Sequence, residues 1–237
     1  MTLPIHYKRK KEITMYDWYY NNEYILGPKD EIKALFIKLN KWVFENVTEN
    51  NFGINWLGNI VTNAGFKRQD EDPNGFYCHG LILNHFEIEP ENEAESYISF
   101  SSETRFRPVP ELWKAILEKY APHSHYYYIS ENIENNFIES NDKEHHFIND
   151  QFYVEMCFEN PTKVPAKYLA IFDEDPDPGE PDFSWDYTED DIRCGLQYIL
   201  QTEETDIDKL IEIFNEKSEQ DLGKNDFISI TRVKYVD

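Results

Sequence analysis

Basic residues are scarce in this sequence: 23 Lys and Arg stand against 46 Asp and Glu, and the formal net charge at pH 7 is −23. Phosphate backbones are bound by clustered Lys and Arg side chains, so this balance disfavours direct nucleic-acid binding. It disfavours anionic membrane surfaces for the same reason. A basic protein is the partner that this charge favours, because complementary fields accelerate encounter. The alternative is that the acidity serves solubility alone.

Cysteines are few, and long apolar runs are absent. Cys78, Cys157 and Cys194 lie far apart and form neither a CxxC pair nor a disulfide framework, which predicts a reducing, cytoplasmic location. No apolar run approaches the ~20 residues that a membrane helix needs. The N-terminal residues are basic but are followed by no apolar segment of the kind found in secretory signals.

The usual catalytic motifs are missing as well. The sequence contains no GxSxG, no Walker loop and no GxGxxG. Cys78 and His79 are neighbours in a predicted strand, so their side chains point to opposite faces and do not form a nucleophile–base pair. No spacing marks two carboxylates as an acid–base couple. We therefore expect a protein with no catalytic residues and no cofactor.

Aromatic residues, by contrast, are plentiful. They make up 16% of the chain and apolar residues make up 40%, which is enough to build a core and disfavours global disorder despite the charge. The 237 residues fit one large domain or a domain with a substantial appendage.

Strand and helix signals alternate over the first two thirds of the chain. Strands are predicted at 17–26, 76–89, 96–104, 125–131, 135–142 and 151–159, and helices at 27–47, 55–65 and 107–122. Pro28 suits a helix start, Asn55 is predicted to cap the short helix, and Gly65 is predicted to close it. Without the short helix, the short strand at 135–142 and the last strand, the order is βαββαβ. This order predicts an α+β, ferredoxin-like split βαβ antiparallel sheet with its helices on one face.

The composition changes near residue 160. Residues 159–237 carry 21 Asp and Glu against 8 Lys and Arg. Helices are predicted at 188–201, with Thr188 and Asp191 in a capping box, and at 206–220, followed by a strand at 226–236. That strand either returns to the edge of the first sheet or pairs within the tail. The predicted organisation is a flexible lead-in (1–15), a ferredoxin-like domain (16–160) and an acidic appendage packed on it (161–237).

Several stretches, taken in order, resemble the YubB-type ferredoxin-like family. They are "WYYNNEYILGPKDEIKALF", "NWLGNIVTNAGF", "CHGLILNHFE", "ISFSSETRFRPVPELWKAILEKY" and "NDKEHHFINDQFYVEM", and the tail "YTEDDIRCGLQYIL … IDKLIEIFNE … FISITRVKYV" is similar to tails of some members. The resemblance implies a ferredoxin-like fold and an association with plasmids, phages and other mobile elements. It implies no established activity and no catalytic residues. The chain departs from the family pattern where "SENIENNF" replaces an acidic-Pro-Gly turn and where Phe106 stands in place of a common Trp.

The most acidic stretch is "DEDPDPGEPDFSWDY", residues 173–187. Its carboxylates and neighbouring aromatic residues are typical of a docking surface for a basic partner. The predicted partner-binding residues are Asp173, Asp175, Asp177, Glu180, Asp182, Phe183 and Trp185. The alternative is a solvated linker that binds no partner. A calcium loop fits poorly, because Pro178 and Ser184 stand where an EF-hand needs Gly and Glu.

Histidines and arginines offer two further candidate sites. His123 with His125, and His145 with His146, are candidate zinc ligands, but no HExxH motif and no neighbouring cysteine accompanies them, so ordinary surface histidines are favoured. Arg105 and Arg107 precede a predicted helix start and form a candidate anion clamp. Internal ion pairs with nearby carboxylates are the favoured alternative for both arginines.

These observations favour a non-enzymatic, acidic protein of a mobile element that inhibits or neutralises a basic, nucleic-acid-binding or toxic protein. A small metal-dependent hydrolase or nucleotide-handling enzyme built on His123 and His125 is the first alternative. A structural or regulatory scaffold whose acidity serves only solubility is the second.

Overall fold

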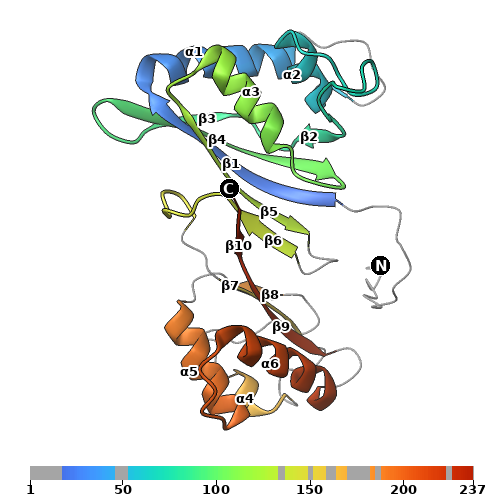
Figure 1. Cartoon of the computed structure of the whole chain (residues 1–237), viewed down its shortest axis with the longest axis vertical. Coiled ribbons are helices and arrows are strands. Elements are labelled where there is room, and N and C mark those ends of the chain that lie inside the picture. Colours follow the sequence, from blue (N-terminus) through green and yellow to red (C-terminus); the bar gives the residue numbers. More distant parts are fainter. Residues whose placement is uncertain are drawn as a thin grey trace, which may run out of the picture.

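The computed structural model describes residues 18–45, 53–132, 137–148, 152–158, 164–169, 182–184, 188–222 and 226–236, with the backbone alone at 169 and 182–184. The predicted α+β class is confirmed. The described residues form a mixed seven-stranded sheet, a three-stranded sheet and six α-helices. Figure 1 shows two units, a larger one that holds the seven-stranded sheet and a smaller one that holds the C-terminal helices.

The large sheet is organised around two long central strands. Its strands are β1 (Trp18–Pro28), β2 (Gly80–Ile82), β3 (Glu87–Pro90), β4 (Glu95–Arg105), β5 (His125–Asn132), β6 (Phe137–Ser140) and β10 (Lys234–Tyr235). Their order is β10-β6-β5-β1-β4-β2, and β3 also pairs with β4. Neighbouring strands are antiparallel except for β10, which runs parallel to β6 and makes the sheet mixed.

The single strand predicted at 76–89 is instead two short strands, β2 and β3, on the same partner β4. Between them the backbone N–H of Leu83 donates to Ser101, and the Asn84 side chain accepts from the Ser101 N–H at 2.6 Å. Because a side chain replaces a main-chain acceptor at this point, the regular ladder is interrupted and the strand is divided.

Three helices cover one face of the large sheet (Figure 1). They are α1 (Lys29–Asn40), which continues as the π-helix η1 (Lys41–Glu45), α2 (Leu57–Asn63) and α3 (Pro110–Tyr120). The apolar residues at three-four spacing in α1, Ile32, Leu35 and Leu39, are all fully buried, as the periodicity predicts. Trp113 of α3 is also fully buried and packs against Phe100 of β4, with ring centroids 4.7 Å apart.

For the short helix, the predicted C-terminal end is confirmed and the predicted N-cap is wrong. Gly65 closes it with a φ of 74°, a conformation that glycine adopts without strain. Asn55 does not cap it. Trp56 is the N-cap, and the Asn55 side-chain amide donates to the Ile82 carbonyl at 2.6 Å, tying the segment before the helix to β2.

The smaller unit has its own sheet and core. Its strands, β7 (Phe152–Cys157), β8 (Asp182–Ser184) and β9 (Phe227–Arg232), lie in the order β8-β7-β9. Its helices are α4 (Ala166–Leu169), α5 (Glu189–Leu200) and α6 (Ile207–Asp221). The predicted capping box of α5 is present, with Thr188 and Asp191 bonded to each other's backbone N–H. Phe152, Leu196, Leu210 and Phe214 are fully buried between the sheet and the helices.

The predicted C-terminal strand pairs both within the tail and at the edge of the large sheet, the two alternatives that the sequence left open. Its first part, β9, pairs with β7, and after Val233 its second part, β10, pairs with β6 at the edge of the large sheet. Figure 1 shows this segment running from the smaller unit to the larger one. Since β7 pairs with β9, a strand predicted within residues 16–160 lies in the sheet of the C-terminal part. The boundary at residue 160 itself stays a prediction.

A small apolar cluster lies where the two units meet. It consists of Ile129, Ile138, Ile148, Tyr153 and Val233. We call these five residues the junction cluster. Among the residues that the structure describes, no helix is both long enough and apolar enough to cross a membrane.

Candidate protein-interaction site

The acidic stretch singled out in the sequence falls mainly outside the described residues. Asp173, Asp175, Asp177, Glu180 and Trp185 lie outside them, and the side chains of Asp182 and Phe183 do so too. The backbone of these last two residues belongs to β8, where Phe183 pairs with Glu155 and Asp182 with Met156. The partner-binding role of these seven residues therefore stays a prediction.

The two arginines of the candidate anion clamp have different surroundings. The Arg107 guanidinium lies 3.5 Å from Glu111 and 5.7 Å from the centre of the Tyr77 ring. The Arg105 guanidinium lies 4.6 Å from the centre of the Phe106 ring. The contact between Arg107 and Glu111 is the kind of internal ion pair that the sequence favoured over an anion clamp.

His123 is joined to a helix rather than to another histidine. Its Nδ1 lies 2.5 Å from Glu31 Oε1, and its backbone N–H donates to Glu31 Oε2 at 3.1 Å. These hydrogen bonds hold the pKa of the Glu31 carboxyl below its usual range. His125 is exposed and lines an open surface pocket of about 320 Å³ together with Lys114 and Glu118.

His145 and His146 lie in the loop after β6. The His145 ring donates from Nδ1 to the Ile148 carbonyl at 2.9 Å, and His146 Nε2 lies 3.1 Å from Glu144. Within the described ranges, the structure brings no three His, Cys, Asp or Glu side chains together in a way that could hold a metal ion. The four candidate zinc ligands are thus not assembled into a site by the residues described.

The structure also contains a buried carboxylate, Glu23, that no sequence motif indicated. Glu23 lies in the middle of β1 on the face covered by the helices, and only 1% of it is exposed. The Tyr126 hydroxyl donates to Glu23 Oε1 at 2.7 Å. Burial raises the pKa of Glu23 to about 7, an effect that the nearby Ser102, Tyr126 and Trp113 side chains only partly offset.

Other polar side chains adjoin Glu23 on the same buried face. In the strand register Asn21 lies opposite Ser102 of β4 and Ser130 of β5. The Asn21 amide donates to Ser102 Oγ and to Thr104 Oγ1, each at 3.1 Å. Asn21, Glu23 and Ile25 alternate along β1, so the apolar Ile25 could have shown that the two polar residues share its buried face. This polar patch is enclosed by the fold, which suits a structural role rather than an open binding site.

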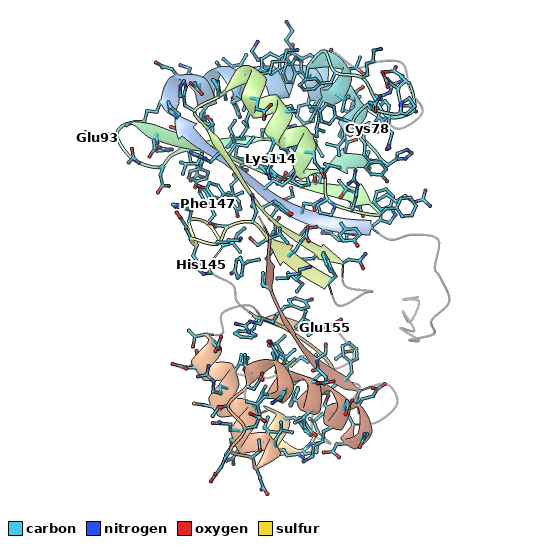
Figure 2. The ribbon with its side chains drawn as sticks, viewed as in Figure 1. Cys78, Glu93, Lys114, His145, Phe147 and Glu155 are labelled. Carbon is cyan, nitrogen blue, oxygen red and sulfur yellow. The ribbon has the colours of Figure 1, made fainter. Side chains whose placement is uncertain are left out.

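Within the described residues, no helix packs directly on the opposite face of the large sheet (Figure 1). Part of it is covered by the loop after β6, where the Phe147 ring stacks on Tyr24 with a centroid distance of 4.6 Å. Figure 2 shows Phe147 and His145 in this loop, on the side of the sheet away from the helices. Asp142, fully buried, holds the loop by accepting from the backbone N–H groups of residues 146, 147 and 148 at 2.8–3.0 Å.

A second part of this face is covered by the smaller unit, through the contacts of Ile129 and Ile138 with Tyr153 and Val233 in the junction cluster. Beyond both covers, the described residues of this face combine carboxylates with half-exposed apolar side chains. Tyr20 of β1 is 50% exposed, and the register places Glu103 of β4 on one side of it and Glu131 of β5 on the other. Because side chains alternate along a strand, all three project from the face opposite the helices.

Most arginines of the described chain contact the protein's own carboxylates. Arg68 pairs with Asp70 and Glu71. In the smaller unit, Arg193 and Arg232 share Glu189, and further contacts join them to Asp190 and Asp208. These pairs neutralise cations that would otherwise be available to phosphate. The excess of carboxylates therefore dominates the outer surface.

No protein-family model, curated protein or solved structure matches this chain. The resemblance to the YubB-type family accordingly stays a prediction. The surface and the charge of the molecule itself are therefore the observations that bear on its function.

Proposed function

We propose that this protein is a non-enzymatic, acidic binding protein that inhibits or neutralises a basic protein, such as a nucleic-acid-binding protein or a toxin. The observation that carries the proposal is the net charge of −23. In addition, the guanidinium groups of four arginines, Arg68, Arg107, Arg193 and Arg232, are paired with carboxylates of the same chain. Such a surface attracts a basic partner at long range and occupies the cations that the partner would use for phosphate.

The finer architecture belongs to the same proposal. We infer a ferredoxin-like split βαβ unit made of β1, α1, β2 and β3, β4, α3 and β5. The neighbour order β5-β1-β4-β2 and the helices on a single face support it. The origin in a mobile element rests on the resemblance to the YubB-type family alone.

The proposal predicts a partner whose binding depends on salt and competes with nucleic acid. The purified protein is used to retain proteins from a lysate of its host at low and at high salt, and retained proteins are identified by mass spectrometry. We expect a basic protein that is lost at high salt, because exposed ion pairs are screened. The purified partner should then lose nucleic-acid binding or activity when this protein is added.

Two results would contradict the proposal. One is that no retained protein depends on salt. The other is that the purified partner binds nucleic acid and this protein simultaneously, with unchanged affinity for each. A protein whose acidity serves only solubility would give the first result.

A further inference from the structure

One corner of the large sheet combines exposed apolar surface with carboxylates. Six residues form it: Tyr20, Asn22, Leu83, Ser101, Glu103 and Glu131. We call them the sheet patch. Tyr20 and Leu83 are about half exposed, at 50% and 46%, although both belong to apolar residue types. An exposed apolar surface bordered by polar groups is typical of an interaction site.

The register fixes how the two carboxylates frame the tyrosine. Glu103 and Glu131 are the cross-strand partners of Tyr20 on its two sides. Directly opposite residues of antiparallel strands have Cβ atoms about 4.5–5.5 Å apart. The phenol ring therefore rises from the sheet between two acidic side chains, held by three paired strands rather than by a loop.

This arrangement suits a planar cation better than any other group. A guanidinium can lie on an aromatic ring and share hydrogen bonds with carboxylates, whereas an ammonium is a point charge that does not stack. Leu83 lies across β4 from Asn22 and offers an apolar surface further along the same face. Ser101 donates to Asn22 at 2.9 Å and forms a polar edge beside the ring.

The charges that face this corner are mainly negative. Glu87 of β3 is exposed and lies on the same face, opposite Ser99. Arg105 follows at the end of β4, with its guanidinium over Phe106. A second copy of the chain is a poor occupant, because two molecules that each carry −23 repel one another.

We propose that the sheet patch is the docking site for an arginine of a basic partner protein, with the guanidinium stacked on Tyr20 between Glu103 and Glu131. This inference rests on the proposed function and adds the place and the chemistry of contact. It puts the primary contact on the large sheet rather than in the acidic stretch 173–187.

The test uses two labelled probes, an octa-arginine and an octa-lysine peptide, and measures their affinity for the full chain by fluorescence anisotropy. We expect the arginine peptide to bind more tightly. The double variant Glu103→Gln with Glu131→Gln should weaken it about tenfold, because two ion pairs are lost while the Tyr20 ring remains. Tyr20→Ala should weaken the arginine peptide and leave the lysine peptide nearly unchanged.

A matched control removes the same charge elsewhere. Glu212→Gln with Glu216→Gln changes two exposed carboxylates of α6 and should alter affinity less than twofold. Circular dichroism confirms that each variant is folded. Equal losses for the sheet-patch and α6 variants would overturn the docking site while leaving the proposed function intact, since binding would then follow net charge alone.

Failure of the unaltered chain to bind either peptide would count against both proposals. Residues 8–11, Lys-Arg-Lys-Lys, are a competing occupant within the chain itself. If peptides bind only after these four residues are changed to Gln, the sheet patch belongs to that segment and the proposal for an external partner is overturned.

Discussion

At the scale of single residues, Glu23 is the side chain whose surroundings differ most from those expected for its type. Only 1% of it is exposed, it adjoins the buried polar side chains of Asn21 and Ser102, and the Tyr126 hydroxyl donates to it. Burial of a carboxyl disfavours its charged form, which is why the pKa of Glu23 rises to about 7.

This pKa makes stability fall as the pH rises. Between the usual value of 4.5 and about 7, the folded chain holds a proton on Glu23 that the unfolded chain has lost, so the free energy of unfolding decreases across this window and is level above it. Glu23→Gln removes the effect and can still accept from Tyr126. As the pH rises from 4.5 to 8, the free energy of unfolding of the variant should increase by about 3 kcal/mol relative to that of the unaltered chain.

Urea unfolding at several pH values measures this difference. Glu103→Gln is the control, because it removes a carboxylate from the opposite face of the same sheet. A stability difference for Glu23→Gln that is independent of pH would show that Glu23 titrates at the same pH in the folded and unfolded chains.

At the scale of elements, patterns that depend on neighbouring residues in sequence were predictable. The three-four spacing of Ile32, Leu35 and Leu39 places α1 on the sheet, and Thr188 with Asp191 starts α5 as expected. Both features are local, since spacing along a helix and a capping box need no knowledge of distant strands.

Features that depend on distant partners were not predictable. The division of the strand at 76–89 depends on the Asn84 bond to Ser101, and the edge strand β10 depends on the position of β6. The burial of Glu23 is only partly local, because alternation along β1 places it on the face of Ile25, whereas the helices packed above that face enclose it. The candidate histidine pairs are a further example, because closeness in sequence did not assemble them into a metal site within the described residues.

The loop after β6 acts as a cover for part of the sheet, and Asp142 is its anchor. Asp142→Ala leaves one buried and two part-buried backbone N–H groups without their acceptor, so we expect a loss of about 3 kcal/mol in stability. The release should be local first. Hydrogen exchange measured by NMR should accelerate at the amides of Phe147 and Ile148 before the rest of the sheet exchanges.

The control for this loop is Glu144→Ala, which changes a side chain that is 81% exposed. It should leave both amides protected. If Asp142→Ala destabilises the protein without selectively exposing these amides, the loop and the sheet unfold as one unit, and Asp142 supports the whole sheet rather than the cover.

At the scale of the whole molecule, the two units are joined by a small contact compared with their own cores. The larger unit buries the apolar residues of β1, β4, β5 and α1 to α3, while the smaller unit buries those of β7, β9, α5 and α6. Five residues make up the junction cluster between them. Chain continuity through β9 and β10 adds a parallel edge pairing of two residue pairs.

Such a contact should couple the unfolding of the units, and one substitution should uncouple it. Val233 is 3% exposed and stands between β9 and β10, in contact with isoleucines of the large sheet. Val233→Asp places a charge among apolar side chains, which is costly without a partner. Neither main core contains this residue, so each unit should stay folded. Scanning calorimetry should resolve two thermal transitions where the unaltered chain gives one.

Ile213→Asp supplies the matched change outside the junction, because Ile213 is 45% exposed on α6 and belongs to neither unit's core cluster. It should keep the single transition. If Val233→Asp also unfolds in one transition at a lower temperature, then the smaller unit depends on the larger for its stability, and the two are a single cooperative structure. If two transitions appear, the smaller unit is an independent module fastened to the edge of the large sheet by β10, and the sheet patch can bind a partner without its help.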